Sequence, residues 1–256
     1  MTEYTDHHAP EGLRTRGTVV VVPGRGETRA TYSRLGRRLA ADAYRVRVVD
    51  ALGLDERDLE GSLTRFGEQL AAAAEDSATG ENGVVRPLVL VGADTGAVAV
   101  AALLGRGGVP SALRPDAVVL AGIPGGGAAA GGGWEDELDV RTSCPAHRDT
   151  LTEDTGTRRG ALDQAVPEAL LTAAHDGGID IPALLLVGDA DPLADRDALA
   201  ATAKSLPRAR LAVVRDAHHD VLNDMQHRSV AAETVTFLET LRNGLVPVVT
   251  VDSSAW

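Results

Sequence analysis

The sequence predicts an α/β protein with a mostly parallel, doubly wound sheet, helices on both faces of the sheet and a short cap. Two observations lead to this fold class. Short apolar runs alternate along the 256 residues with longer amphipathic stretches, which is the pattern of right-handed βαβ units. Most of the short runs are apolar on both faces of the strand, which is typical of parallel strands buried between two helical layers.

This alternation predicts six strands and five helices. The strand candidates are Thr18–Val22, Arg45–Val49, Leu88–Val91, Ala117–Leu120, Ala183–Val187 and Leu211–Val214. The helix candidates are residues 30–42, 58–76, 96–105, 193–204 and 223–242. Each helical stretch is amphipathic, so each can place an apolar side on the sheet.

One interval interrupts the alternation and predicts a cap. No strand candidate falls between Gly122 and Asp180, and this interval begins with a run of glycine and alanine at 125–133, which cannot fill a core and is typical of a hinge. The predicted division is 1–15 as a flexible N-terminus, 16–121 and 181–243 as the core, 122–180 as a Gly-rich hinge and small cap, and 244–256 as a C-terminal tail.

Composition limits the partners that the chain can have. A net charge of −12 disfavours nucleic acid and anionic membranes. The single cysteine, Cys144, excludes an intrachain disulfide and favours a reducing, cytoplasmic compartment. No apolar run reaches the ~20 residues that span a bilayer, and no secretion signal is expected. The expected partner is a small-molecule substrate, and the apolar run Leu245–Val251 leaves a homodimer open, although Pro247 argues against a central strand.

No cofactor and no metal ion are expected. The seven histidines show no ligand spacing with Cys or carboxylates, and the Gly-rich run lacks the Lys-Ser/Thr ending of a phosphate loop.

The most informative segment is Gly92-Ala93-Asp94-Thr95-Gly96, which directly follows a buried strand candidate. A strand, a sharp turn between glycines and then a helix is the pattern of a nucleophile elbow. The central position, which usually holds serine, holds Asp94.

Three further segments follow strand candidates at their carboxyl ends, where open α/β sheets place their sites. They are Pro23-Gly24-Arg25-Gly26-Glu27, Gly188-Asp189-Ala190-Asp191-Pro192 and Asp216-Ala217-His218-His219-Asp220-Val221-Leu222. The order along the chain is therefore elbow, acid, histidine. Asp191 would also suit a helix N-cap, because a proline follows it.

These segments resemble the α/β-hydrolase superfamily over about Gly17 to Leu241. The Gly24-Arg25-Gly26-Glu27 loop, with Tyr32 a few residues on, is most similar to lysophospholipase or monoacylglycerol-lipase scaffolds. The resemblance implies an α/β-hydrolase fold with Asp94 at the nucleophile position, Asp191 as acid and His219 as base, the latter preferred over His218. It also implies an oxyanion hole formed by the backbone N–H groups of Arg25 and Thr95.

Aspartate at the elbow resembles epoxide hydrolases and dehalogenases rather than esterases. A carboxylate displaces a leaving group at sp³ carbon and forms an alkyl-enzyme ester, which water activated by histidine then hydrolyses. The cap departs from these families: it has no tyrosine to bind an epoxide oxygen, and Thr95 stands where dehalogenases commonly have tryptophan. Arg25, Trp134 and His147 are the candidate substrate-binding side chains, and Arg25 suits a substrate carboxylate.

The leading hypothesis is thus a hydrolase with an Asp94–His219–Asp191 constellation that acts on an epoxide or another sp³ electrophile. A tailoring role in secondary metabolism is consistent with the Arg- and Ala-rich composition. Two alternatives stay open. In one, Asp94 and His219 perform acid–base chemistry in a lyase, cyclisation or rearrangement reaction. In the other, the chain is a non-catalytic pseudo-hydrolase that binds a small ligand.

Overall fold

The computed structural model describes residues 4–51, 53, 55–76, 83–107, 109–175 and 178–254. Within them lies one seven-stranded sheet with the order β1-β3-β2-β4-β5-β6-β7. Every pairing is parallel except that of β1 with β3. The strands are β1 (Thr5–His7), β2 (Gly17–Val22), β3 (Tyr44–Val48), β4 (Leu88–Ala93), β5 (Ala117–Ala121), β6 (Ala183–Gly188) and β7 (Ala209–Val214).

All six predicted strands are present, as β2 to β7, within one or two residues of the predicted bounds. The additional strand β1 falls in the segment that we expected to be flexible. It is polar, and its Asp6 carboxylate accepts hydrogen bonds from Arg47 Nε at 2.7 Å and Nη2 at 2.6 Å. This pairing is held by a charged side chain of β3, which is adjacent in the sheet but 41 residues away in the chain. Such a pairing leaves no apolar pattern in the sequence.

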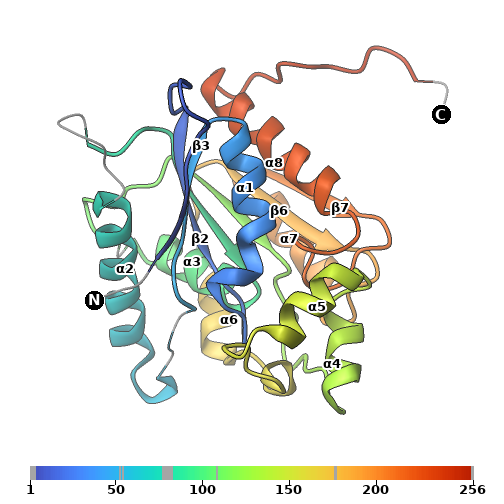
Figure 1. Ribbon diagram of the computed structural model, residues 1–256. Helices are drawn as coiled ribbons and strands as arrows, with labels where there is room; N and C mark the ends of the chain where they lie inside the picture. The colour runs from blue at the N-terminus through green and yellow to red at the C-terminus, as the bar shows by residue number, and fades with distance from the viewer. Residues whose placement is uncertain are drawn as a thin grey trace.

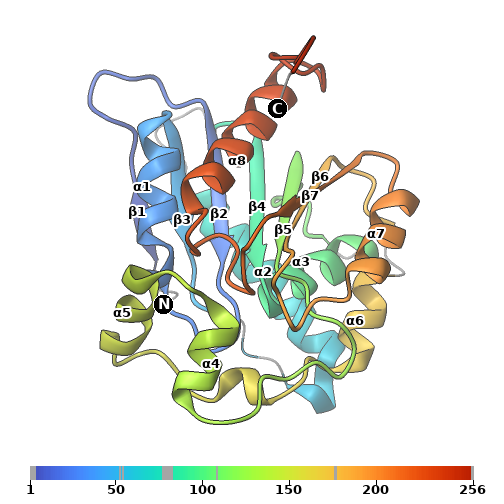
Figure 2. The same ribbon diagram turned by 90° about the vertical axis from the view of Figure 1, so that its right-hand side faces the viewer.

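Helices cover both faces of the sheet (Figures 1 and 2). Helices α1 (Ser33–Ala41) and α8 (His227–Arg242) cover one face, and α2 (Leu59–Asp76), α3 (Thr95–Gly105), α6 (Glu168–His175) and α7 (Arg196–Ser205) cover the other. Among the described residues, further helical segments are the 3₁₀ turns Arg29–Tyr32, Glu56–Asp58 and Ala161–Asp163 and the helices α4 (Trp134–Arg141) and α5 (Pro145–Glu153).

The alternation of side chains along β2 builds both layers of the core. Val19 and Val21 are fully buried and pack in the cluster with α1 and α8, whereas Val20 and Val22 pack in the cluster with α2 and α3. Both faces of each central strand are thus apolar and covered, as the sequence pattern predicts.

The cap is smaller than its predicted span of 122–180. Helices α4 and α5 lie together at the lower end of the sheet in Figure 2, whereas α6 packs on α3. Leu170, Leu171 and Ala174 of α6 belong to the apolar core cluster. The segment from 168 onward is therefore part of the α/β core, and the cap proper consists of α4, α5 and the loops around them.

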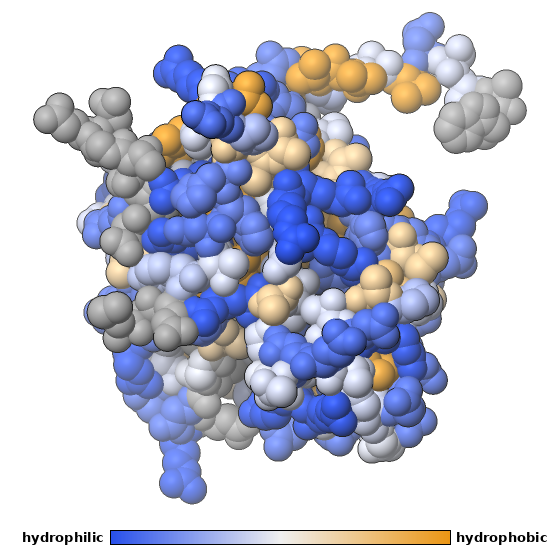
Figure 3. Space-filling view, viewed as in Figure 1, coloured by the Kyte–Doolittle hydropathy of each residue, from blue (hydrophilic) through white to orange (hydrophobic). Residues whose placement is uncertain are grey.

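The C-terminal tail leaves the body of the molecule after α8 (Figure 1). Its apolar residues Val246, Val248, Val249 and Val251 are exposed, and they form an orange stretch set apart from the mostly hydrophilic face in Figure 3. Among the described helices, none combines the length and the apolar character that crossing a membrane requires.

Candidate active site

Asp94 lies on a strained turn between β4 and α3. Its backbone has φ +46° and ψ −122°, a region that residues other than glycine rarely adopt. The flanking glycines allow the turn to be this tight: a Cβ at Gly92 would lie 2.6 Å from Ala97 Cα, and one at Gly96 would lie 2.6 Å from the Pro23 carbonyl oxygen. Because α3 is buried over most of its length, the turn is rigidly held, and the predicted elbow geometry is present.

The loops after β6 and β7 bring the other two predicted residues to Asp94. His219 Nε2 lies 3.2 Å from Asp94 Oδ1, and His219 Nδ1 lies 3.0 Å from Asp191 Oδ2. The other carboxylate oxygen of Asp191 accepts a hydrogen bond from the Leu193 backbone N–H at 2.9 Å. The histidine is thus enclosed between two carboxylates at the carboxyl edge of the sheet.

The structure turns His219, not His218, toward the elbow. His218 is half-exposed, and its Nδ1 lies 2.9 Å from Asp224 Oδ2. Asp191 does not cap α7, because the N-cap of that helix is Asp195, whose side chain accepts a hydrogen bond from the Ala198 N–H. Both carboxylate oxygens of Asp191 are instead used within its own loop and on His219.

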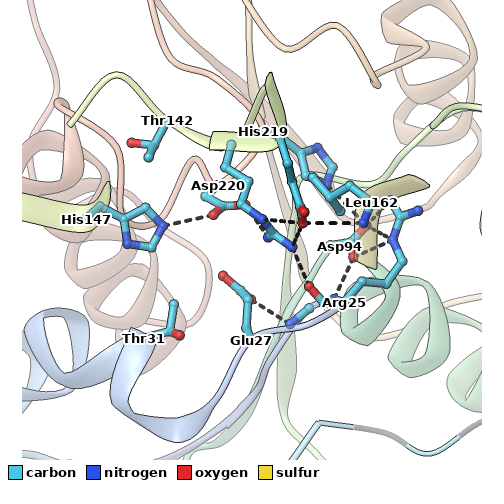
Figure 4. A network of polar contacts seen from close by, with 12 residues as sticks. Arg25, Glu27, Thr31, Asp94, Thr142, His147, Leu162, His219 and Asp220 are labelled. Atoms are coloured by element: carbon cyan, nitrogen blue, oxygen red, sulfur yellow. Dashed lines mark hydrogen bonds and ion pairs between the residues drawn. The ribbon is translucent and has the colours of Figure 1, made fainter. Parts of the chain in front are cut away.

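Arg25 holds Asp94 with both its backbone and its side chain (Figure 4). The Arg25 backbone N–H donates to Asp94 Oδ2 at 2.8 Å. The guanidinium donates from Nε to Oδ2 at 2.8 Å and from Nη2 to Oδ1 at 2.8 Å. Its third nitrogen, Nη1, donates to the Gln164 carbonyl oxygen at the edge of the cap. The fork of one arginine therefore engages both oxygens of the elbow carboxylate.

One of the two predicted oxyanion-hole donors, the Arg25 N–H, is bound to the protein's own Asp94 carboxylate. Asp94 Oδ2 receives the Arg25 N–H, and the Thr95 hydroxyl lies 3.3 Å from the same oxygen. Thr95 is the first residue of α3, so its backbone N–H has no partner inside the helix. Asp94 Oδ2 thus takes up the Arg25 N–H that the sequence assigns to the oxyanion hole.

The charges of this site stabilise one another. Burial alone would raise the pKa of Asp94, but the hydrogen bond from His219 and the charge of Arg25 hold it well below its ordinary value. Burial alone would lower the pKa of His219, but Asp191 and Asp94 together raise it to about 10. At neutral pH the Asp94 carboxylate and the His219 imidazolium therefore form an ion pair inside the site.

A pocket of about 400 Å³ opens beside this site. Arg25, Thr95, Arg158 and Gln164 are among the residues that line it. Asp94 and His219 do not reach its wall, and their side chains are 5% and 0% exposed. The Arg25 side chain thus separates the pocket from the carboxylate that the sequence singles out.

Two of the predicted substrate-binding residues lie elsewhere. His147 is 1% exposed, and its Nε2 lies 2.8 Å from Asp220 Oδ2. Trp134 is half-buried at the start of α4 and stacks with Arg159 at 5.0 Å. Neither lines the pocket beside Asp94. Of the three predicted residues only Arg25 reaches that pocket, and it binds Asp94 rather than an open space.

A second buried polar cluster joins the cap to the core, and the sequence did not predict it (Figure 4). Arg141, fully buried on α4, donates to Glu137 at 2.8 Å and to the Arg25 carbonyl oxygen at 2.7 Å. It also lies 3.5 Å from Asp220 Oδ1. Glu137 and Arg141 have the spacing of an ion pair on an exposed helix face, so only tertiary contacts reveal that they are buried.

Glu27, His147 and Asp220 lie close enough to one another to hold a metal ion. Their ligand atoms already have partners: Glu27 Oε2 accepts from the Gly24 N–H at 2.7 Å and from the Tyr32 hydroxyl, and His147 bonds to Asp220. The Arg141 guanidinium beside Asp220 would also repel a cation. The cluster is better described as a polar junction between cap and core.

The comparisons with known proteins agree with this fold. A sequence profile described as the alpha/beta hydrolase family matches residues 19–233, and the chain therefore belongs to that family. A search of curated proteins by sequence finds no significant match.

Solved structures share the fold at low sequence identity. A monoacylglycerol lipase from Paleococcus ferrophilus is 17% identical, with a TM-score of 0.70 and coverage of 94% of this chain and 99% of that one. A soluble variant of monoglyceride lipase from Saccharomyces cerevisiae is 14% identical, with a TM-score of 0.69 and coverage of 93% and 91%. A carboxylesterase CesB from Bacillus subtilis is 13% identical, with a TM-score of 0.62 and coverage of 93% and 92%. At this identity the likeness concerns the fold alone.

Proposed function

We propose that this protein is a hydrolase that opens an epoxide through an alkyl-enzyme ester on Asp94, with His219 and Asp191 as the proton-transfer pair. The observation that carries the proposal is the position of His219, whose two ring nitrogens lie 3.2 Å from Asp94 and 3.0 Å from Asp191. The aspartate stands on the elbow, where family members carry their nucleophile, and beside the Arg25 N–H that we assign to the oxyanion hole.

The ring-opening step needs a proton, and His219 can supply it. Asp94 Oδ1 forms a bond to an epoxide carbon, the ring C–O bond breaks, and its electron pair goes to the epoxide oxygen. The His219 imidazolium, whose pKa is raised to about 10 by Asp191 and Asp94 against the effect of burial, protonates that oxygen. The proton donor that cap tyrosines supply in other epoxide hydrolases is therefore not required here.

The second step uses the neutral histidine that the first step leaves. Water attacks the Asp94 ester carbonyl and gives a proton to His219, while the carbonyl oxygen becomes an anion next to the Arg25 and Thr95 donors. Collapse of this intermediate breaks the bond between the Asp94 carbonyl carbon and the product oxygen, which takes up the proton of the hydroxyl that water has added to that carbon. The diol leaves, and Asp94 and the imidazolium return to their initial states.

The proton that His219 gives in the first step and accepts in the second favours an epoxide over an alkyl halide as the substrate. A halide leaves as an anion and takes no proton, so His219 would remain an imidazolium and would be unable to accept a proton from water. It would first have to release its proton from a fully buried position beside Asp191. An epoxide removes that proton as part of its own reaction.

A single turnover in H₂¹⁸O tests the proposal without any substitution. With enzyme in excess over a panel of epoxides, the first turnover should place ¹⁸O in the Asp94 carboxylate and none in the diol, because water attacks the ester carbonyl. Mass spectrometry of the peptide that contains Asp94 measures the label. A converted epoxide whose diol carries ¹⁸O, with unlabelled Asp94, would contradict a covalent ester and favour acid–base chemistry at this site. If no epoxide is converted but small ligands bind, the pseudo-hydrolase alternative gains support.

A further inference from the structure

Arg25 closes the path from the pocket to Asp94. Its side chain is 8% exposed, Arg25 lines the pocket, and its guanidinium engages both Asp94 oxygens. Its third nitrogen is bound to the Gln164 carbonyl, which lines the same pocket. In this state Asp94 Oδ1 already accepts hydrogen bonds from Arg25 Nη2 and His219 Nε2, so it has no lone pair directed at an incoming carbon.

Arg25 must therefore leave Asp94 before the carboxylate can attack anything. A neutral molecule offers the guanidinium no replacement for its buried partner, and leaving a buried charge unpaired is strongly unfavourable. A carboxylate on the ligand does offer a replacement, because it presents the same two oxygens to the same fork. The exchange then keeps the guanidinium paired while Asp94 is released.

The pocket favours such a ligand in a second way. Arg158 lines it, is exposed, and forms no ion pair with the residues that the structure describes. Glu27 also lines the pocket, but its Oε2 already accepts hydrogen bonds from the Gly24 N–H and the Tyr32 hydroxyl. An exposed Arg158 therefore attracts an anion to the pocket even though the whole chain carries a net charge of −12. The exposed guanidinium of Arg158 thus matches a small anionic molecule better than the long acyl chain of a lipid.

We propose that the substrates of this protein carry a carboxylate, and that this carboxylate displaces Asp94 from Arg25 and thereby exposes the nucleophile. The inference deepens the proposed function and rests on it for the reaction. The binding step stands separately, because it requires only that Arg25 exchanges one carboxylate for another. Arg25 is in this view both the specificity residue and the gate of the site.

Competition between Asp94 and the ligand gives a test by binding alone. We would titrate the protein calorimetrically with cyclopropanecarboxylate, an unreactive analogue of an epoxy acid, and with the neutral cyclopropanecarboxamide. Asp94→Asn removes the competing carboxylate, so the carboxylate should bind about tenfold more tightly or better than to the wild type. Arg25→Met should abolish its binding, and Arg25→Lys should weaken it because the fork is lost.

Control experiments separate carboxylate binding through Arg25 from a general attraction of anions to arginines of the cap. Arg159→Gln removes a cap arginine that does not line the pocket and should leave carboxylate binding unchanged. The carboxamide should not bind in competition with the carboxylate. Equal affinity of wild type and Asp94→Asn, or carboxylate binding that survives in Arg25→Met, would overturn the inference. Inorganic phosphate that binds through Arg25 while the carboxylate does not would overturn the assignment to a carboxylate.

An experiment with two reactive epoxides distinguishes the inferred role of Arg25 from the proposed reaction on Asp94. Glycidate and glycidamide are epoxides that differ in the charge next to the ring, and each is supplied in H₂¹⁸O. Asp94 in the wild type should be labelled by glycidate at least tenfold faster than by glycidamide, and Arg25→Met should lose that preference while it keeps the backbone N–H of the oxyanion hole. If both epoxides label Asp94 of the wild type at the same rate, the inferred gating by Arg25 is contradicted, whereas the proposed hydrolysis on Asp94 is supported. Carboxylate binding that depends on Arg25, without any labelling of Asp94, would support the role of Arg25 and contradict the proposed hydrolysis.

Discussion

The guanidinium of Arg25 binds both carboxylate oxygens of Asp94, although the two residues stand 69 positions apart on separate loops of the sheet edge. The ion pair is buried, with exposed side-chain fractions of 8% and 5%. A catalytic nucleophile is ordinarily open toward its substrate. Here the elbow carboxylate is paired on one side with Arg25 and on the other with His219, so its charge contributes to the stability of the resting site.

The first prediction concerns that contribution. Asp94→Asn removes the negative charge and leaves Arg25 and the His219 imidazolium with less compensation, so the free energy of unfolding should fall by about 3 kcal/mol. Asparagine tolerates the positive φ of this turn, which keeps backbone strain out of the comparison. Chemical denaturation at neutral pH measures the change.

Asp216→Asn is the matched control for this variant. Asp216 also has a positive φ, of 55°, but it is exposed, so the same substitution should change the free energy of unfolding by less than about 0.5 kcal/mol. If the two variants lose the same stability, the pairing with Arg25 contributes little and the site is less rigid than the contacts indicate.

The second prediction tests whether the elbow, the histidine and the oxyanion hole form a working hydrolytic site. Asp94→Ser places a hydroxyl next to His219, and the loss of the Asp94 charge removes one of the causes that raise the pKa of that histidine. The variant should hydrolyse p-nitrophenyl acetate about 10²-fold faster than Asp94→Ala, since a general base contributes roughly that factor. An acetyl group on residue 94 in mass spectra would show the acyl intermediate. Equal rates for the two variants would mean that the oxyanion donors are not placed for ester chemistry.

The sequence predicts those features of the site that follow from a local pattern of residues. It does not predict those that depend on contacts between residues far apart in the chain. The strands that carry the site were predictable because each is apolar on both faces, and the glycines on each side of Asp94 marked the elbow. His219 and Asp191 followed from their positions after strands. The Arg25–Asp94 pair did not, because the sequence indicates which loops meet but not which way a long side chain turns. The burial of Arg141 and Glu137 was equally hidden, since their spacing is that of a solvated helix face.

The third prediction follows from the protonation of His219. Asp191 and Asp94 raise its pKa to about 10 in the folded protein, against the effect of burial, from an ordinary 6.5. The stabilisation that its positive charge provides is therefore complete below pH 6.5, declines above it and is lost as the pH rises through 10. The difference in free energy of unfolding between wild type and His219→Gln should narrow over this range. A difference that has already vanished near pH 7 would show a neutral histidine, and it would remove the proton donor from the proposed ring opening.

The last prediction concerns Glu27, which lies in the loop that also carries Arg25. Burial and the charge of Asp220 raise the pKa of Glu27 to about 7, although Arg141 and the Tyr32 hydroxyl oppose the rise. A carboxyl with a raised pKa favours the folded state only while it is protonated, so this contribution is complete below its ordinary value of 4.5 and is lost as the pH rises through 7. The stability of the wild type relative to Glu27→Gln should therefore fall between pH 4.5 and pH 7 and stay constant at higher pH.

Urea unfolding across this pH range measures the relative stability, with Glu75→Gln on the exposed side of α2 as the control for loss of a surface carboxylate. A relative stability that rises with pH instead would mean that Arg141 dominates the environment of Glu27, and that the junction between cap and core is held by an ion pair rather than by a protonated acid.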